Sequence, residues 1–185
     1  MNLHGLSQLP LSAERGWPEL VRIRPGLLRL FVFLVLPLSL LPPAMLYYAG
    51  THHPEMFGEV YGRKPWGQVA AVFFTAEIAT LLAMGWLIKQ VAGTNKLEID
   101  YHDAYMLAAI APVPMWLSSL GLLIPNLFVS VIIAIVGVGL SWGILHHGIL
   151  ALCRTREDVV AGGIVQTVFG MGLVAWAFLL LLALA

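Results

Sequence analysis

Five long apolar segments alternate with short polar stretches along the chain, and their lengths predict helices that cross a membrane. A hydrocarbon core of about 30 Å requires roughly 20 apolar residues in a helix that rises about 1.5 Å per residue. The segments of this kind are residues 27–49, 67–91, 105–124, 127–152 and 159–185. They are too long and too continuously apolar for barrel strands, and only helices and closed barrels satisfy the backbone in lipid. The pattern therefore predicts an all-α fold, a polytopic membrane protein built as a bundle of five transmembrane helices.

The polar stretches divide the chain into two parts. Residues 1–26 form an N-terminal flank that is partly amphipathic, and residues 27–185 form one transmembrane domain. Proline, glycine, asparagine and charged residues mark the breaks between spans, which read THHPEMFGEVYGRKP, AGTNKLEIDYHD, PN and RTRED. Because only Pro125 and Asn126 separate the third span from the fourth, these two spans are expected to form a helical hairpin.

The composition agrees with a membrane protein. The chain is 59% hydrophobic and 11% charged, whereas about a quarter of the residues in a soluble domain are charged. Its formal net charge is zero, and without a block of basic residues we expect no nucleic-acid partner. The single cysteine, Cys153, excludes an intrachain disulfide. The first apolar run is longer than the roughly 7–15 residues of a signal peptide, so we expect a retained helix.

The basic residues predict how the bundle is oriented. An odd number of spans places the two termini on opposite sides of the membrane, and lysine and arginine favour the cytoplasmic side. With the N-terminus inside, the outer segments hold only Arg63 and Lys64. The inner segments hold Arg15, Arg22, Arg24, Arg29, Lys89, Lys96, Arg154 and Arg156. We therefore expect the N-terminus in the cytoplasm and the C-terminus outside.

The N-terminal flank mixes apolar and basic residues just before the first span. Trp17 and Leu20 occur together with Arg22 and Arg24 in the stretch GWPELVRIRPG. Such a pattern is typical of a segment that lies on an anionic membrane surface. An ordinary juxtamembrane flank is the alternative interpretation.

The residues of the first and third spans resemble the Yip domain family, most closely its bacterial inner-membrane branch, the YohC-like proteins. The first span contains PLSLLPPA, and in MLAAIAPVPMWLSSL Pro114 takes the family's proline position, followed by Leu117, Ser118 and Leu120. Ala109 and Ile110 stand where glycine and tyrosine are typical, and the Asp-Leu-Tyr-Gly-Pro motif of eukaryotic members is absent. The resemblance implies a non-catalytic, multi-pass protein of the bacterial inner (cytoplasmic) membrane, without a GTPase partner.

The chain carries few residues in catalytic or metal-binding patterns. The chain has no GxSxG, HExxH, CxxC or phosphate-binding glycine loop, so we expect neither an enzyme nor a cofactor. His52, His53 and Glu55 in the loop after the first span carry atoms that bind zinc. Their spacing matches no established ligand set, so a solvated loop is the main interpretation and a metal site the alternative.

Small residues in the last two spans allow close helix packing. Gly139 and Gly143 form a GxxxG pair in the fourth span, and glycines recur in the fifth. The main interpretation is packing within one subunit. A contact that forms a homo-oligomer, or one with another membrane protein, is the alternative.

One carboxylate lies in the middle of the second span. Glu77 is ten residues from Gly67, so it lies about 15 Å into the membrane. An acidic side chain at this depth costs roughly 2.5–3.5 kcal/mol on insertion scales, so it must face protein or water and find a partner. No lysine or arginine lies at that depth, and an uncharged, protonated side chain is therefore the least costly state.

The candidate partners of Glu77 are uncharged. Thr80, Gln166 and Thr167 offer polar side chains, and Pro112 and Pro114 should break the third span and free backbone carbonyls. One hypothesis makes Glu77 a neutral packing residue. The other gives it a role with a proton, a cation or a substrate, since a broken helix beside an acidic side chain is how some transporters build an ion site.

Two functions follow from these alternatives. The main hypothesis is a non-catalytic Yip-type protein that organises membrane lipids or protein partners, with the basic flank, the NKLEIDYHD linker and the RTRED turn as its contact surface. The other is a small transporter or channel-like protein that uses Glu77. A dry, closed bundle would favour the first hypothesis, and a polar cavity that reaches Glu77 would favour the second.

Overall fold

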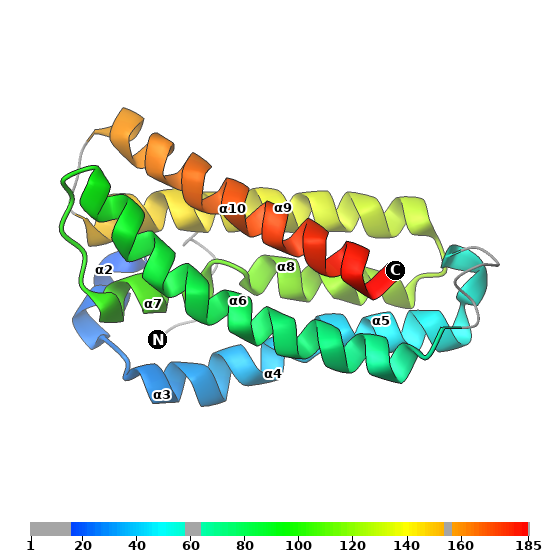
Figure 1. Ribbon diagram of the computed structural model, residues 1–185. Coiled ribbons are helices and arrows are strands. Elements are labelled where there is room, and N and C mark those ends of the chain that lie inside the picture. Colours follow the sequence, from blue (N-terminus) through cyan, green and yellow to red (C-terminus); the bar gives the residue numbers. More distant parts are fainter. Residues whose placement is uncertain (1–15, 58–63, 154–156, 185) are drawn as a thin grey trace.

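The computed structural model describes residues 16–57, 64–153 and 157–184 (Figure 1). Every regular element in these ranges is a helix. Five of the helical segments are long and apolar enough to cross a membrane, which confirms the predicted fold class. They are Leu27–His52, Trp66–Thr94, Tyr101–Leu123, Leu127–Leu152 and Asp158–Phe178. Arg15, Arg63, Arg154 and Arg156, which entered the prediction of orientation, lie outside the described residues.

The first span is irregular along its length. The short helix α2 (Trp17–Ile23) precedes it, and the span itself consists of α3 (Leu27–Leu30), a π-helical turn (Phe31–Val35), α4 (Leu36–Ser39) and α5 (Leu41–His52). Pro37 lies in the first turn of α4, and Pro42 lies in the first turn of α5. Proline has no amide hydrogen, so each removes a bond of the helical ladder, and the helix is reorganised around these positions.

The second span is one continuous helix, and the third is interrupted. Helix α6 runs over Trp66–Thr94, after a short 3-10 turn at Pro54–Phe57. Helix α7 (Tyr101–Ile110) is separated by two residues from α8 (Val113–Ser118), and a 3-10 turn (Ser119–Leu123) completes the span. The interruption lies next to Pro112 and Pro114, whose missing amides and bulky rings disfavour a continuous helix.

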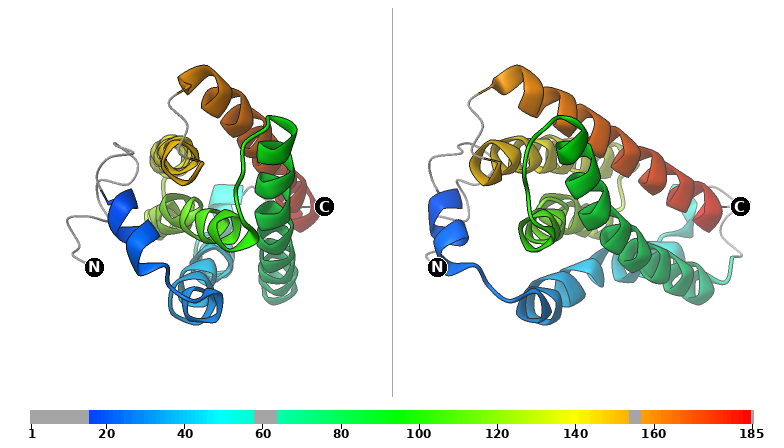
Figure 2. Two further views of the ribbon diagram at one scale, coloured as in Figure 1. Left: turned by 90° about the vertical axis from the view of Figure 1, so that its left-hand side faces the viewer. Right: turned by 60° about the vertical axis from the view of Figure 1, so that its left-hand side comes forward.

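The fourth and fifth spans are the long helices α9 (Leu127–Leu152) and α10 (Asp158–Leu184). The side chain of Asn126 caps α9 by accepting a hydrogen bond of 3.2 Å from the amide of Val129. The third span has the largest buried share, 39% against 22–28% for the others. It accordingly lies in the middle of the bundle, with the other spans around it (Figure 2). The third span is therefore the core of the fold.

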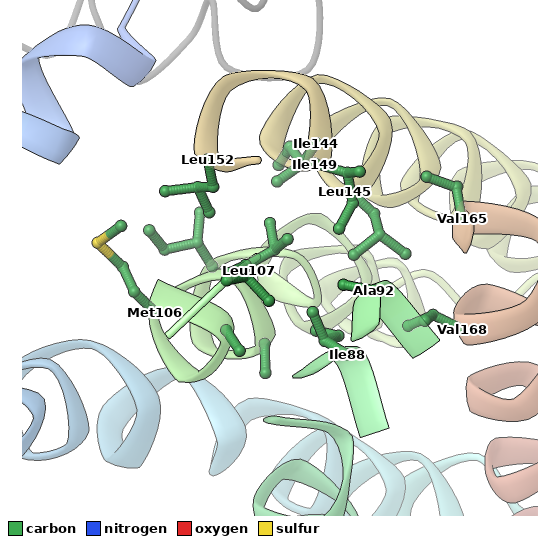
Figure 3. Packing of buried hydrophobic residues seen from close by; sticks show 14 of the residues in the cluster. Ile88, Ala92, Met106, Leu107, Ile144, Leu145, Ile149, Leu152, Val165 and Val168 are labelled. Atoms are coloured by element: carbon green, nitrogen blue, oxygen red, sulfur yellow. The ribbon is translucent and has the colours of Figure 1, made fainter. Parts of the chain in front are cut away.

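The largest apolar core lies at the end of the bundle that holds α2. It joins residues of α6, α7, α9 and α10, among them Ile88, Leu107, Ile149 and Val165 (Figure 3). Trp17 and Leu20 of α2 belong to the same core, with exposed fractions of 0% and 2%. The apolar side of the amphipathic flank therefore packs against the protein rather than against a membrane surface.

Glycines allow this docking, although Gly139 of the GxxxG pair is not one of them. A side-chain carbon on Gly148 would lie 2.4 Å from Cδ1 of Leu107 and 2.7 Å from Cη2 of Trp17. One on Gly137 would lie 2.8 Å from Cβ of Ser118. In contrast, one on Gly139 would meet nothing within 4 Å in the described part of the chain. Gly137 and Gly148 thus bring α8 and α2 close to α9.

Candidate functional site

Glu77 meets its partner across the interface between the second and third spans. It lies eleven residues after Trp66 in α6, which places it about 16 Å along a helix of 29 residues. Its Oε1 accepts a hydrogen bond from the indole Nε1 of Trp116 in α8. A tryptophan, and neither a charged residue nor a freed carbonyl, is therefore the observed partner of this carboxyl group.

The break in the third span positions Trp116. Helix α8 restarts after Pro112, whose carbonyl accepts a hydrogen bond of 3.0 Å from the amide of Trp116. The indole is 3% exposed and packs with Val35, Leu81 and Tyr105 in a second apolar cluster. Close contact with α9 at Gly137 supports the other side of α8. The indole is therefore fixed by packing on more than one side, and its N–H points to α6.

Glu77 borders a pocket inside the bundle. The pocket has a volume of about 410 Å³ and is lined by side chains of α5, α6, the third span, α9 and α10. Its walls are mainly aliphatic and aromatic, including Phe73, Met84, Trp116, Val168 and Trp176. Sites for small organic molecules have roughly this size and this apolar character, with a few polar groups that fix orientation.

Most polar groups of the pocket wall are already hydrogen-bonded to nearby backbone. The hydroxyl groups of four lining residues donate to carbonyl groups at 2.6–3.0 Å, and these residues are Thr80, Ser118, Ser119 and Ser130. Two buried side-chain atoms of the wall have no partner among the described residues, Oε2 of Glu77 and Oγ of Ser141. Both atoms have almost no accessible surface, so they lie within the packed wall rather than on the surface of the pocket.

Two of the polar residues expected near Glu77 lie elsewhere. Gln166 and Thr167 are exposed on α10 and do not line the pocket. The hydroxyl of Thr167 donates to the carbonyl of Gly163 at 2.9 Å. Thr80 does line the pocket, as expected from its position one turn after Glu77. Sequence reasoning missed Trp116 and Ser141, although a tryptophan in mid-span, far from the membrane interfaces, was a usable signal.

The histidines after the first span make local contacts. His52 stacks on Tyr48 with ring centroids 4.4 Å apart, and its Nδ1 lies 3.1 Å from the carbonyl of Tyr48. His53 Nδ1 lies 3.4 Å from a carboxyl oxygen of Glu55. These contacts leave the proposal of a metal site at His52, His53 and Glu55 without added support.

A charged cluster lies at the opposite end of the molecule from these histidines, at the start of α7. The Arg24 guanidinium bonds the carboxylate of Asp100 and lies 3.3 Å from that of Asp103. The amide of Asp103, and then Arg24, hold the pKa of Asp100 below its usual range, and Asp100 raises the pKa of Arg24. Ligand atoms of Asp100, His102 and Asp103 lie within 4.8 Å of one another, but Arg24 already supplies a positive charge there.

Cys153 is unsuited to nucleophilic chemistry. It follows the last residue of α9, where burial raises the pKa of its thiol to about 11. A thiol with such a pKa is protonated at neutral pH, and the thiolate is the reactive form. The cysteine is therefore a packing residue of the core.

Comparison with known proteins identifies the family. The model of the Yip1 domain matches residues 9–183, which is nearly the whole chain. No curated protein and no solved structure matches the chain significantly. The matched region includes all five membrane-spanning segments and the whole pocket. The chain therefore belongs to the Yip1 domain family.

Proposed function

We propose that this protein is a non-catalytic, multi-pass protein of the bacterial inner membrane, of the YohC-like branch, that organises membrane lipids by holding a lipid molecule in its internal pocket. The N-terminus lies in the cytoplasm and the C-terminus outside. The positive-inside pattern supports this orientation. The charged loops at the cytoplasmic end, together with the ion pair between Arg24 and Asp100, provide the surface for protein partners.

The character of the pocket carries this proposal. Its wall is apolar nearly throughout, and the hydroxyl groups of Thr80 and of three serines are bonded to backbone carbonyls. A route for ions or water needs polar groups that replace hydration, and this wall offers few. A hydrocarbon chain, in contrast, is complementary to such a wall.

Two glycine substitutions on the same helix test the proposal. Gly172 lines the pocket, and a side-chain carbon there would have Met84 Cε at 3.4 Å as its nearest neighbour, so Gly172→Leu fills the pocket. Gly170 lies outside the pocket, and a side chain there meets nothing within 4 Å in the described part of the chain. Gly170→Leu is therefore the matched control.

The measurement is the lipid that remains with the protein after purification in mild detergent, extracted and quantified by mass spectrometry. Wild type and Gly170→Leu should retain about one lipid per chain after extensive washing, and Gly172→Leu should retain much less. Equal retention by the two leucine variants, or a wild type without bound lipid, contradicts the proposal.

A transporter is the second candidate function, and the unpartnered Oε2 of Glu77 is the observation that favours it. A carboxyl group that carries a coupled proton needs an atom free to exchange it. In proteoliposomes, Glu77→Gln would then abolish a flux that wild type supports. If the Glu77→Gln variant retains lipid and supports growth as wild type does, the transporter candidate fails.

A further inference from the structure

The pocket is long and narrow, and it extends along the bundle. Its lining residues run from Leu127 to Leu145 on α9, which corresponds to about 27 Å along the helix, and from Phe73 to Ile88 on α6, which corresponds to about 22 Å. A methylene group takes up about the volume of a water molecule, roughly 30 Å³. The pocket volume of about 410 Å³ therefore accommodates about 14 methylene groups, which is one acyl chain and not two.

The lining residues that are exposed mark where the pocket opens. Among the residues that the structure describes, they are Leu127, Val131 and Trp176, with exposed fractions of 55%, 47% and 38%. Leu127 and Val131 lie in the first two turns of α9, and Trp176 lies in the C-terminal part of α10. Helix α10 is farther from α9 at this end than at its start (Figure 2). The pocket therefore opens sideways to lipid between α9 and α10, in the half of the membrane where α9 begins.

The opposite end of the pocket is closed. There the lining residues are Ile88, Leu145 and Val168, with exposed fractions of 1%, 3% and 1%. All three belong to the largest apolar core of the bundle. A chain that enters between α9 and α10 therefore ends against this core.

The wall offers little that could bind a polar head group. The four lining hydroxyl groups described above already donate to backbone carbonyls, and Oε2 of Glu77 and Oγ of Ser141 have almost no accessible surface. No lysine, arginine or histidine lines the pocket in the described ranges. A phosphate or an amine inside the pocket would lose its hydration without gaining a partner. The head group of a bound lipid must therefore stay outside the pocket.

We infer that the pocket takes up one acyl chain of a membrane lipid, that the chain enters sideways between α9 and α10, and that the head group remains in the leaflet where α9 begins. In the proposed orientation this is the outer leaflet. The inference rests on the proposed function, because it assumes that the pocket holds a lipid. It adds that the protein recognises the chain and not the head, so lipids with the same chain and different heads bind alike.

The first test blocks the opening. Val131→Trp places a large ring where the chain would enter. Ile132 is 46% exposed and does not line the pocket, so Ile132→Trp is the matched control on the neighbouring position. The full chain is equilibrated in mild detergent with equal amounts of phosphatidylethanolamine and phosphatidylglycerol that carry the same chains, and the retained lipid is quantified by mass spectrometry. Val131→Trp should retain at least about fivefold less lipid than wild type and Ile132→Trp, because the indole overlaps the chain.

The second test uses wild type only. The retained phosphatidylethanolamine and phosphatidylglycerol should stay within about twofold of the supplied ratio, because the head groups lie outside the pocket. Lysophosphatidylethanolamine, which has a single chain, should displace the bound lipid as well as phosphatidylethanolamine does.

The failures of the two proposals are distinguishable. If Val131→Trp retains as much lipid as Ile132→Trp, if one head group is strongly preferred, or if the single-chain lipid does not compete, this inference fails. The proposed function survives these results as long as Gly172→Leu loses the lipid that Gly170→Leu keeps. If Gly172→Leu and Gly170→Leu retain equal lipid, the pocket holds none, and the proposed function fails as well.

Discussion

The hydrogen bond between Trp116 and Glu77 can be tested by a double-mutant cycle. Trp116→Phe removes the donor and keeps an aromatic ring, and Glu77→Leu removes the acceptor and keeps a side chain of similar size. Hydrogen bonds between membrane helices contribute about 0.6 kcal/mol on average and at most about 1.7 kcal/mol. Because Trp116 is buried and Glu77 is partly buried, we expect a coupling energy in the upper part of that range, about 1–1.7 kcal/mol, in the free energy of unfolding.

Each single variant measures the loss of stability when one polar group is left without its hydrogen-bond partner. Trp116→Phe should destabilise by about 1–3 kcal/mol, because it leaves Oε1 of Glu77 without a donor. Glu77→Ala should have a cost in the same range, and Glu77→Gln should change stability by less than about 0.5 kcal/mol, because its carbonyl still accepts from the indole.

The assay is unfolding by sodium dodecyl sulfate in mixed micelles, followed by circular dichroism. The double variant should be more stable than the sum of the single losses predicts, since it leaves neither group orphaned. Additive losses within about 0.3 kcal/mol would refute the reasoning, because they would mean that the two side chains do not interact. A strongly destabilised Glu77→Gln variant would also count against it.

Three further predictions concern the ends of the bundle. Gly148→Ala should destabilise by about 1–3 kcal/mol, because the methyl group overlaps Leu107 and Trp17, whereas Gly162→Ala, with open space around it, should not; thermal unfolding in detergent decides this. Asp100→Asn keeps the helix cap but loses the charge that Arg24 binds. Because the pKa of Asp100 is lowered on folding, its contribution exists above the unfolded pKa of about 3.9 and disappears as the pH falls through the folded value, so wild type and variant should converge in acid. Accessibility tags should place the N-terminus inside and the C-terminus outside, and tags on one side would overturn the predicted orientation.

The sequence predicts the spans well because span length and apolarity are local properties. The same holds for the interruption of the third span, since Pro112 and Pro114 act on their own helix. The contact between Glu77 and Trp116 joins residues on different helices. The sequence of one helix does not determine which face the other helix turns toward it. Helix α10 is apolar around most of its surface, so its sequence does not tell that Gln166 and Thr167 face away from the pocket.

The N-terminal flank illustrates the same limit. Its mixture of apolar and basic residues indicates an amphipathic segment, and in α2 the residues Trp17 and Leu20 form the apolar side. The pattern contains no information on whether lipid or protein covers this side. That depends on Gly148, whose missing side chain makes room for the indole of Trp17.

The docking of α2 also sets a time order for biosynthesis. Gly148 follows Trp17 by about 130 residues in the chain, and translation proceeds at about 5–20 residues per second. Roughly 7–26 s therefore separate the appearance of the indole at the ribosome from the appearance of its binding position. During that interval the surface of α9 on which the indole packs does not exist, and the bilayer is an apolar phase within reach of the flank. We therefore expect the nascent flank to adsorb to the membrane first and to join the bundle when the fourth span arrives.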